Sequence, residues 1–195
     1  MTIKYPSIIL VRPQLPENIG MVARAMNNFG LNDLIVVSPR ENWLNNKTIN
    51  AAKKANSIIK NIKVFSSLED AISNFTYVIA TTNRKRYLEK KSTTDFKYLK
   101  NKINSYKKSA ILFGPENSGL SNEDLNLADI IFSINTSNQN NSLNLSHAVS
   151  ILCYKIFELN NLKNNTNLKS KLTYINKSQL SKYFDYLFLN LENRG

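Results

Sequence analysis

The hydrophobic residues of this chain gather in short runs, rich in β-branched side chains, that recur along most of its length. The runs lie at 8–11, 34–37, 77–80, 111–113 and 130–134. Between most of them, apolar residues recur at intervals of three and four, which is the period of an amphipathic helix. Buried strands that alternate with helices are typical of a parallel sheet covered by helices. The pattern therefore predicts an α/β domain whose parallel sheet is flanked by helices.

The clearest helical pattern follows the first run, and Gly30 is placed to end that helix. Its apolar face consists of Ile19, Val22, Ala23, Met26 and Phe29. A shorter helical stripe spans 68–75, and Ser121 to Asp124 resembles a helix capping box. A long helix is predicted from the segment 142–146 to about Leu159.

The end of the chain has a different pattern. Residues 160–167 are rich in Asn and lack periodicity, which is typical of a linker. A last amphipathic segment follows, with an apolar stripe of Leu180, Tyr183, Phe184, Leu187, Phe188 and Leu191. We therefore expect one domain over 1–159, and a linker with a terminal helix over 160–195. We expect the apolar stripe of that helix to be buried against the domain, against a second subunit or against residues beyond Gly195.

Composition narrows the class of protein. A chain of 195 residues with 42% hydrophobic residues is neither disordered nor too small for a substantial core. The longest apolar runs are far shorter than the roughly 20 residues that cross a bilayer, and the start of the chain does not resemble a signal peptide. We expect a cytoplasmic protein without membrane association. The sequence has one cysteine, Cys153, and one histidine, His147, so no metal site is expected. Cys153 is predicted to be a buried apolar residue.

The chain is strongly basic, with a formal net charge of +12. Its densest basic segment runs from Arg84 to Lys108 and contains ten basic residues and two acidic ones. The aromatic residues within it are Tyr87, Phe96, Tyr98 and Tyr106. Two interpretations are open: a solvated surface, or an RNA-facing surface whose cations bind phosphates and whose aromatic rings stack on bases.

Polar loops follow several of the predicted strands, at 81–83, 114–116 and 134–136. In a parallel sheet such loops meet at one edge, which is where ligands bind. The segment 142–146 adds a helix start with free backbone N–H groups and hydroxyls. The glycine-rich dinucleotide fingerprint and the phosphate-binding loop are both missing from the sequence. The common nucleotide-binding folds are therefore not indicated.

Three segments together carry a resemblance to a known family. They read Asn18-x-Gly20-x-x-x-Arg24, Phe113-Gly114-x-Glu116-x-x-Gly119-Leu120 and Ser142-Leu143-Asn144-Leu145-Ser146. In this order and spacing they resemble the three motifs of the TrmH-type branch of the SPOUT class, whose members methylate ribose 2′-hydroxyls of RNA. The resemblance covers roughly residues 5 to 159.

The resemblance implies a C-terminal trefoil knot, binding of S-adenosylmethionine, an RNA substrate and a homodimer. The residues that it places around the cofactor are Thr81, Thr82, Asn83, Gly114, Ile134, Asn141, Ser142, Leu143 and Asn144.

The resemblance also assigns the catalytic residues. Arg24 is central, Asn18 and Ser142 lie near it, and Glu116 supports the site. Because an arginine stays protonated, we expect Arg24 to fix a substrate phosphate, which accepts the proton of the 2′-hydroxyl. Gly20 is expected to keep the same side of the helix open for the RNA backbone.

Simpler interpretations of these residues stay open. Arg24 is also compatible with a surface cation, Asn18 with a helix N-cap, and Glu116 with a capping or ion-pair partner. The single histidine, His147, is expected to be a packing residue of its helix.

Within the branch, the compact start at 11–20 resembles members that methylate a cytidine or uridine ribose in the anticodon loop of tRNA. Asn117, Asn135 and Asn140 depart from the pattern, which has Arg, Pro and Tyr at these places, and they leave the substrate nucleotide open. A ribosomal RNA methyltransferase and a non-catalytic RNA-binding protein with the same fold are the alternatives.

Overall fold

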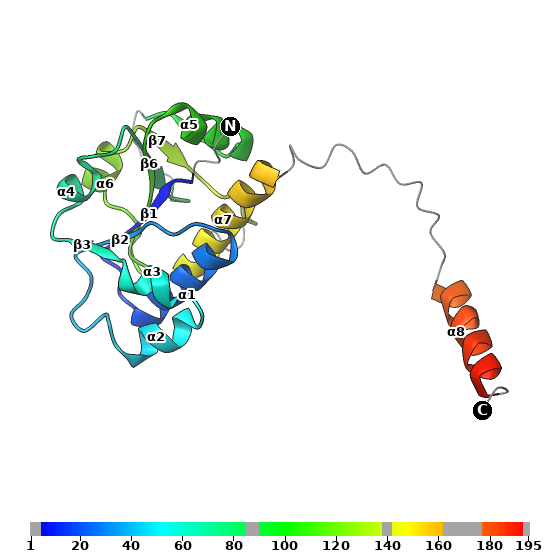
Figure 1. Ribbon diagram of the computed structural model, residues 1–195. Coiled ribbons are helices and arrows are strands. Elements are labelled where there is room, and N and C mark those ends of the chain that lie inside the picture. Colours follow the sequence, from blue (N-terminus) through cyan, green and yellow to red (C-terminus); the bar gives the residue numbers. More distant parts are fainter. Residues whose placement is uncertain (1–4, 85–89, 138–141, 162–176, 193–195) are drawn as a thin grey trace. The chain divides into compact units, whose positions relative to one another are not determined.

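The structure is a computed structural model of residues 1–195, of which residues 5–84, 90–137, 142–161 and 177–192 are described (Figure 1). The chain divides into two compact units, Met1–Lys163 and Asn164–Gly195. The described part of the second unit is one helix, α8 (Lys177–Glu192), in the region where a terminal helix was predicted. The predicted domain limits of 159 and 160 stay a prediction.

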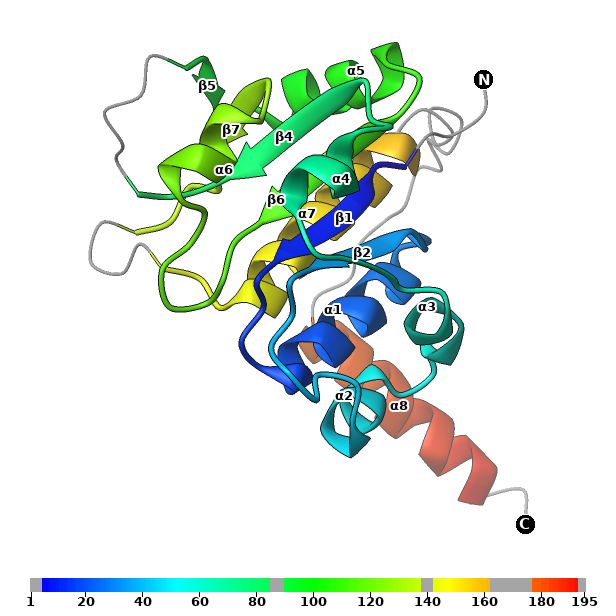
Figure 2. The same ribbon diagram turned by 90° about the vertical axis from the view of Figure 1, so that its left-hand side faces the viewer.

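The first unit is built on a seven-stranded sheet in which every neighbouring pair is parallel (Figure 2). Its strands are β1 (Ser7–Val11), β2 (Leu34–Val37), β3 (Lys63–Phe65), β4 (Tyr77–Thr81), β5 (Ser92–Thr93), β6 (Ser109–Phe113) and β7 (Ile130–Phe132). Each of the five apolar runs forms a strand, which confirms the α/β fold with a parallel sheet. The sequence pattern missed β3 and β5, because they have three and two residues and mostly exposed side chains.

The order of the strands across the sheet is β3-β2-β1-β6-β4-β7-β5. Strands β1, β2 and β3 thus follow one another toward one edge of the sheet. The chain then crosses to β4 on the other side of β1, and β6 later pairs between β1 and β4. As a result, the carboxyl ends of β4, β6 and β7 lie next to each other, although the strands are far apart in the sequence.

Helices cover both faces of the sheet. They are α1 (Pro16–Asn28), α2 (Asn46–Ala52), α3 (Asn56–Lys60), α4 (Leu68–Ile72), α5 (Phe96–Ser105), α6 (Asn122–Asn126) and α7 (Leu145–Asn161). Strand β1 shows the two sides: Ile8 and Leu10 pack with α1 and α7, whereas Ile9 and Val11 pack with α4 and α6. Alternate residues of a strand point to opposite faces, so both sides of the sheet are buried.

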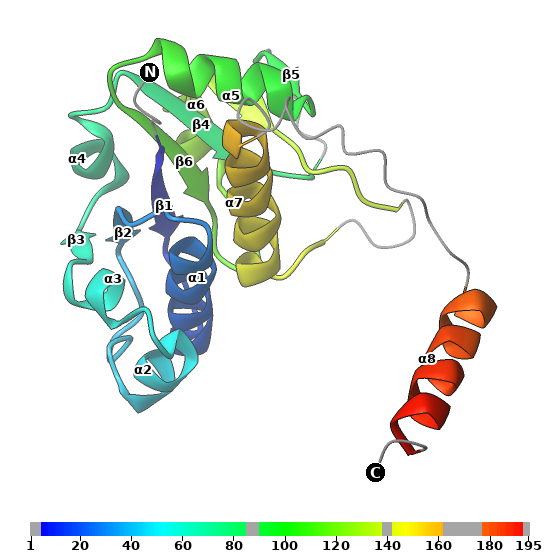
Figure 3. The ribbon, with the colours of Figure 1, turned by 45° about the vertical axis from the view of Figure 1, so that its right-hand side comes forward.

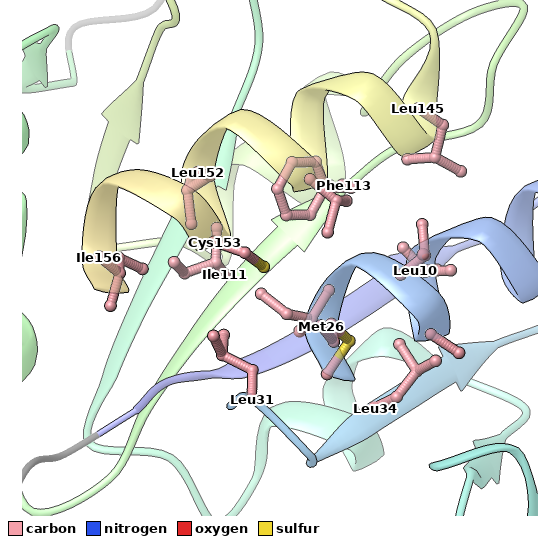
Figure 4. Packing of buried hydrophobic residues seen from close by; sticks show 14 of the residues in the cluster. Leu10, Met26, Leu31, Leu34, Ile111, Phe113, Leu145, Leu152, Cys153 and Ile156 are labelled. Carbon is pink, nitrogen blue, oxygen red and sulfur yellow. The ribbon is translucent and has the colours of Figure 1, made fainter. Parts of the chain in front are cut away.

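The larger core lies between the sheet and the pair α1 and α7, which run side by side on one face (Figure 3). Figure 4 shows Met26 of α1 and Cys153 of α7 pointing toward the strand residue Ile111. Cys153 is fully buried, as predicted, and burial raises the pKa of its thiol to about 12. His147 lies on the exposed side of α7, so the expectation that it packs within the helix interface is wrong.

Two glycines shape α1. Gly30 has a φ of +76° and follows the last turn, where the amide of Leu31 donates to the carbonyl of Met26. This confirms Gly30 as the stop signal, because glycine adopts that conformation without strain. Gly20 faces α2, and a Cβ there would lie 2.2 Å from the carbonyl oxygen of Thr48. The expectation that Gly20 leaves a side of α1 open for RNA is therefore wrong: it lets α1 and α2 approach.

The described helices include none that is long and apolar enough to cross a membrane. Within the described ranges there is likewise no group of three His, Cys, Asp or Glu residues arranged to hold a metal ion.

Candidate functional site

A pocket of about 230 Å³ lies where the carboxyl ends of β4, β6 and β7 meet the start of α7. Seven of the nine residues assigned to the cofactor line it: Thr81, Thr82, Asn83, Gly114, Ile134, Ser142 and Leu143. Asn144 lies directly beside Leu143 but does not line the pocket, and Asn141 falls outside the described residues. The structure thus brings together residues from four segments that are distant in the sequence.

The pocket also contains residues that were not assigned to the cofactor. Its apolar lining includes Phe113 and Leu145, which belong to the motifs, and Phe132 and Ala148, which do not, and Arg84 adds a cation at its edge. The signal for Arg84 was its place directly after Asn83, in the same loop. The apolar lining could have been found from the strand ends and the first turns of α7, because these residues close the core beneath the loops.

The loop after β4 is held by hydrogen bonds to its neighbours. The hydroxyl of Thr81 donates to the carbonyl of Leu112 at 2.7 Å, and the amide of Thr82 donates to the carbonyl of Phe132 at 3.2 Å. The side-chain amide of Asn83 donates to the hydroxyl of Thr136 at 2.9 Å. These contacts tie the loop to β6 and to the segment after β7, so this part of the pocket is formed before any ligand arrives.

The loop after β6 turns back on itself at two glycines. A Cβ on Gly114 would lie 2.2 Å from the backbone nitrogen of Leu120, so no larger residue fits there. Gly119 has a φ of +69°, and its amide donates to the carbonyl of Pro115 at 2.8 Å. The tight turn leaves backbone groups rather than side chains at this wall of the pocket.

The carboxylate of Glu116 connects this loop to the start of α1. One oxygen accepts from the amide of Gln14 at 2.8 Å. The other accepts from the amide of Leu15 at 3.2 Å and from the side chain of Asn18 at 2.7 Å. Three donors to one carboxylate form a strong, charge-assisted cluster, so Glu116 fixes the path of the chain between β1 and α1.

Asn18 is buried in the first turn of α1, three residues after the N-cap residue, Leu15. The interpretation of Asn18 as the N-cap is therefore wrong. Besides its bond to Glu116, its side-chain oxygen accepts from the side chain of Asn144 at 3.4 Å. The side-chain oxygen of Asn144 in turn accepts from the amide of Ser146 at 2.9 Å, which caps α7. One chain of hydrogen bonds thus links the three motifs.

Arg24 lies apart from the pocket. It is on the exposed side of α1 and has no hydrogen bond or ion pair with the part of the chain that the structure describes. It does not line the pocket. Met21, one turn earlier on the same helix, is closer to the motif residues, with its sulfur 3.9 Å from the hydroxyl of Ser146. Within a single chain, the residue predicted to be central to catalysis is not brought to the cofactor pocket.

The basic segment is only partly a free surface. The ammonium group of Lys90 donates to the carbonyls of Leu125 and Asn126, both at 2.8 Å, where it neutralises the end of α6. Lys100 is buried and donates to the carbonyl of Leu159. These two cations stabilise the fold, so the choice between a solvated surface and an RNA-facing one concerns fewer residues than the sequence suggested.

The aromatic residues of the segment are also engaged. Phe96 packs edge to face on Phe132, with ring centroids 4.9 Å apart. Tyr106 stacks on Tyr77 at 4.3 Å. Tyr98 is half-buried and has the ammonium groups of two lysines near its ring, while Tyr87 lies outside the described residues. Phe96 and Tyr106 thus each pack on another ring of the fold, so the RNA-facing interpretation has fewer fully available rings than the sequence suggested.

Comparisons with known proteins agree with this picture. Residues 6–154 match the model of the SpoU rRNA Methylase family. The tRNA (cytidine-2'-O-)-methyltransferase TrmJ of Methanocaldococcus jannaschii is 34% identical over 180 residues, which cover 90% of this chain and 74% of that protein. The crystal structure of TrmJ from Z. mobilis ZM4 matches with a TM-score of 0.75 at 36% identity, over 98% of this chain and 81% of that one.

A more distant structure shows how widely the fold is shared. The SpoU methyltransferase AviRb from Streptomyces viridochromogenes, solved with AdoMet, has a TM-score of 0.64 at 18% identity, over 82% of this chain and 62% of that one. At this identity the likeness concerns the fold alone. The parallel sheet, the three linked motifs and the match over 6–154 lead to one conclusion: the chain belongs to the SpoU family of RNA methyltransferases.

Proposed function

We propose that the protein transfers the methyl group of S-adenosylmethionine to a ribose 2′-hydroxyl of RNA, and that tRNA is the substrate. The observation that carries this proposal is the pocket at the carboxyl ends of β4, β6 and β7, because seven of the nine cofactor residues implied by the motifs line it. S-adenosylmethionine, when bound, supplies the methyl group.

The lining of the pocket suits that cofactor. Ile134 and Leu143 offer apolar contacts for the faces of an adenine ring, and the backbone around Gly114 offers hydrogen-bonding groups without side-chain obstruction. Ser142 is exposed at the rim, where we place the reacting ribose. Asn18 and Glu116 act through position, since their hydrogen bonds hold the rim between β6 and α7.

A homodimer accounts for the position of Arg24. The exposed sides of α1 and α7 carry Met21, Tyr154 and Phe157, which are 39%, 44% and 37% exposed. Phe29 lies between the two helices, with its ring 5.8 Å from that of Tyr154. We propose that two copies associate through this face, and that each Arg24 serves the pocket of the partner. Burial of such an apolar patch provides the driving force for association.

In this arrangement Arg24 binds the phosphate next to the target ribose. The guanidinium stays protonated, so it is not the base. As the ribose 2′-oxygen takes up the methyl group and S-adenosylhomocysteine leaves, a phosphate oxygen would accept the proton of the 2′-hydroxyl, and Arg24 would stabilise the negative charge that develops. Ser142 and the rim hold the ribose in line, which supplies much of the rate through positioning.

The C-terminal trefoil knot remains part of this proposal. It is supported by the insertion of β6 between β1 and β4, and by Ser142 and Leu143 before α7, which line the same pocket as the tight loop after β6.

The choice of tRNA is supported by the name of the M. jannaschii relative, a tRNA (cytidine-2'-O-)-methyltransferase. A ribosomal RNA substrate is the second candidate, since the matched family is described by rRNA methylation. The two candidates differ in substrate and share the pocket and the reaction.

Incubation with labelled S-adenosylmethionine and unmodified tRNA, followed by nucleoside analysis, tests the proposal. We expect label on the 2′-oxygen of a cytidine or uridine. Label on a base, or no label on tRNA or rRNA, would contradict it. Calorimetry with S-adenosylmethionine separates the enzyme from a non-catalytic RNA-binding protein, which would give no binding heat.

A further inference from the structure

A second, wider cleft lies beside the cofactor pocket. It has a volume of about 840 Å³ and lies between the ends of β1 and β2, the starts of α4 and α6, and the loop before α6. Much of its lining is hydroxyl and amide groups, contributed by Ser38, Ser66, Ser67, Ser118, Ser121 and Asn122. Leu127, which is 36% exposed, adds apolar surface, whereas Leu68 and Leu120 are buried beneath the cleft. The proposed methyl transfer uses none of these residues.

The cleft adjoins the cofactor pocket. Arg84 and Gly119 line both cavities, and the guanidinium of Arg84 donates to the carbonyl of Asn117 at 3.0 Å. The wall between the two therefore includes one side chain and a short stretch of backbone. Because the two cavities share these residues, adjacent nucleotides of one RNA strand can occupy the pocket rim and the cleft.

The charge of the cleft argues against a phosphate as its occupant. Arg12 and Asp124 form an ion pair and neutralise each other. The remaining charged groups of the cleft are the carboxylates of Glu69 and Glu123 and the guanidinium of Arg84, which gives the cleft a net negative charge. Hydrogen bonds from the Ser121 side chain and from its own backbone hold the pKa of Glu123 below its ordinary value, so this carboxylate stays charged at neutral pH. Two exposed carboxylates repel phosphate and accept hydrogen bonds from N–H groups.

Nucleobases provide such donors. The exocyclic amino groups of cytosine, adenine and guanine donate to carboxylates, and serine hydroxyls pair with either donors or acceptors on the base edge. The exposed side chain of Leu127 provides a contact for the face of the ring. A base reaches a cleft of this kind only when it is unstacked, as in a single-stranded loop.

We propose that this cleft binds an unstacked nucleobase with an exocyclic amino group, adjacent in the RNA to the nucleotide that is methylated. The inference rests on the proposed function for the identity of the polymer, and it adds that the substrate is a loop whose neighbouring base is selected by Glu69 and Glu123.

Photo-crosslinking tests the inference. Anticodon stem-loop RNAs that carry 6-thioguanosine at one loop position at a time are irradiated with the protein, and the modified peptides are mapped by mass spectrometry. We expect crosslinks from one loop position to the segments that contain Glu69 and 118–127. In Ser118→Trp the indole fills the cleft, so these crosslinks are lost and RNA binding weakens by roughly tenfold, as for the loss of one bound base. Ser118 is exposed and does not line the cofactor pocket.

Ser57→Trp is the matched control, because Ser57 is exposed on α3 and lines neither cavity. It should crosslink as the unchanged protein does. Crosslinks that map only elsewhere, or that persist in Ser118→Trp, would overturn the inference. The same RNAs are assayed for methylation: methylation without cleft crosslinks rejects the base site alone, and cleft crosslinks without methylation reject the enzymatic function alone.

Discussion

The pocket edge of the sheet and the exposed face of α1 and α7 differ in how far the side chains of one chain satisfy each other's hydrogen bonds and bury each other's apolar surface. At the pocket edge, Glu116, Asn18 and Asn144 are linked by hydrogen bonds of 2.7 Å and 3.4 Å, so the site is assembled on folding. On the helical face, Arg24 has no such bond to the described residues, and Tyr154 and Phe157 are partly exposed. The comparison teaches that the three motifs mark two kinds of region: one that is preformed, and one that our proposal completes with a second molecule.

Loss of the Glu116 carboxylate should have the largest effect, because it disrupts the preformed region. In Glu116→Ala the amides of Gln14 and Leu15 and the side chain of Asn18 lose their acceptor. We expect a loss of roughly 2 kcal/mol in the free energy of unfolding, as for partly buried donors left unpaired, together with loss of methyl transfer. Urea denaturation measures the first effect. Glu41→Ala, at an exposed position, is the control and should leave both unchanged.

Substitution of Arg24 should separate the two regions. Arg24→Ala is expected to lower methyl transfer about a hundredfold or more, because the charge that binds phosphate and stabilises the transition state is removed. Folding stability and the calorimetric affinity for S-adenosylmethionine should not change, since Arg24 does not line the pocket. An equal loss of cofactor binding and of activity would remove Arg24 from the catalytic role.

Introduction of a charge on the helical face should weaken association, with a smaller cost to folding because the ring of Phe157 also packs 5.9 Å from that of Phe29. In Phe157→Glu a carboxylate replaces a ring that is 37% exposed on α7, and its burial between two copies is unfavourable. We expect the proposed dimer to weaken at least about tenfold by analytical ultracentrifugation, with unchanged cofactor affinity per chain. A protein that is monomeric before the substitution would contradict the proposed dimer.

The buried side of α7 gives the smallest and most local prediction. Because burial raises the pKa of Cys153 to about 12, its thiol is protonated at pH 8 as well as shielded by the core. The folded protein should therefore not react with iodoacetamide at pH 8, whereas the urea-unfolded protein should react at one site. Rapid labelling of the folded protein would show that α7 does not protect its core face.

Strands β1, β2, β4, β6 and β7, helices α1 and α7 and most of the pocket could be predicted from the sequence, because each depends on local patterns and on motif spacing. Helix α5, within the basic segment, was not predicted. Runs such as Ile8 to Val11 are too apolar to lie outside a sheet, and Gly30 ends α1 as expected. β3 and β5 could not be predicted, because strands of three and two residues are too short to show a hydrophobic period. Their pairing depends on neighbouring strands of the sheet.

Long-range polar contacts are the second class that the sequence does not reveal. Nothing near Lys90 indicates that its ammonium group caps α6, and nothing near Gly20 shows that α2 packs against it. The clustering of basic residues between Arg84 and Lys108 suggested one surface, whereas the fold uses Lys90 and Lys100 internally. Composition describes what is present in a segment, but the tertiary contacts decide which groups stay free.

Mixed dimers give the most direct test of the central claim, that a pocket formed within one chain works with Arg24 of a second copy. Leu143→Arg blocks the pocket at a lining residue, and Arg24→Ala removes the catalytic cation, so each variant alone should be inactive. When the two are unfolded together in equal amounts and refolded, half of the random dimers are mixed, and each mixed dimer has one intact site. The account predicts recovery of about a quarter of the unmodified activity. No recovery, in a mixture shown to contain mixed dimers, would contradict it.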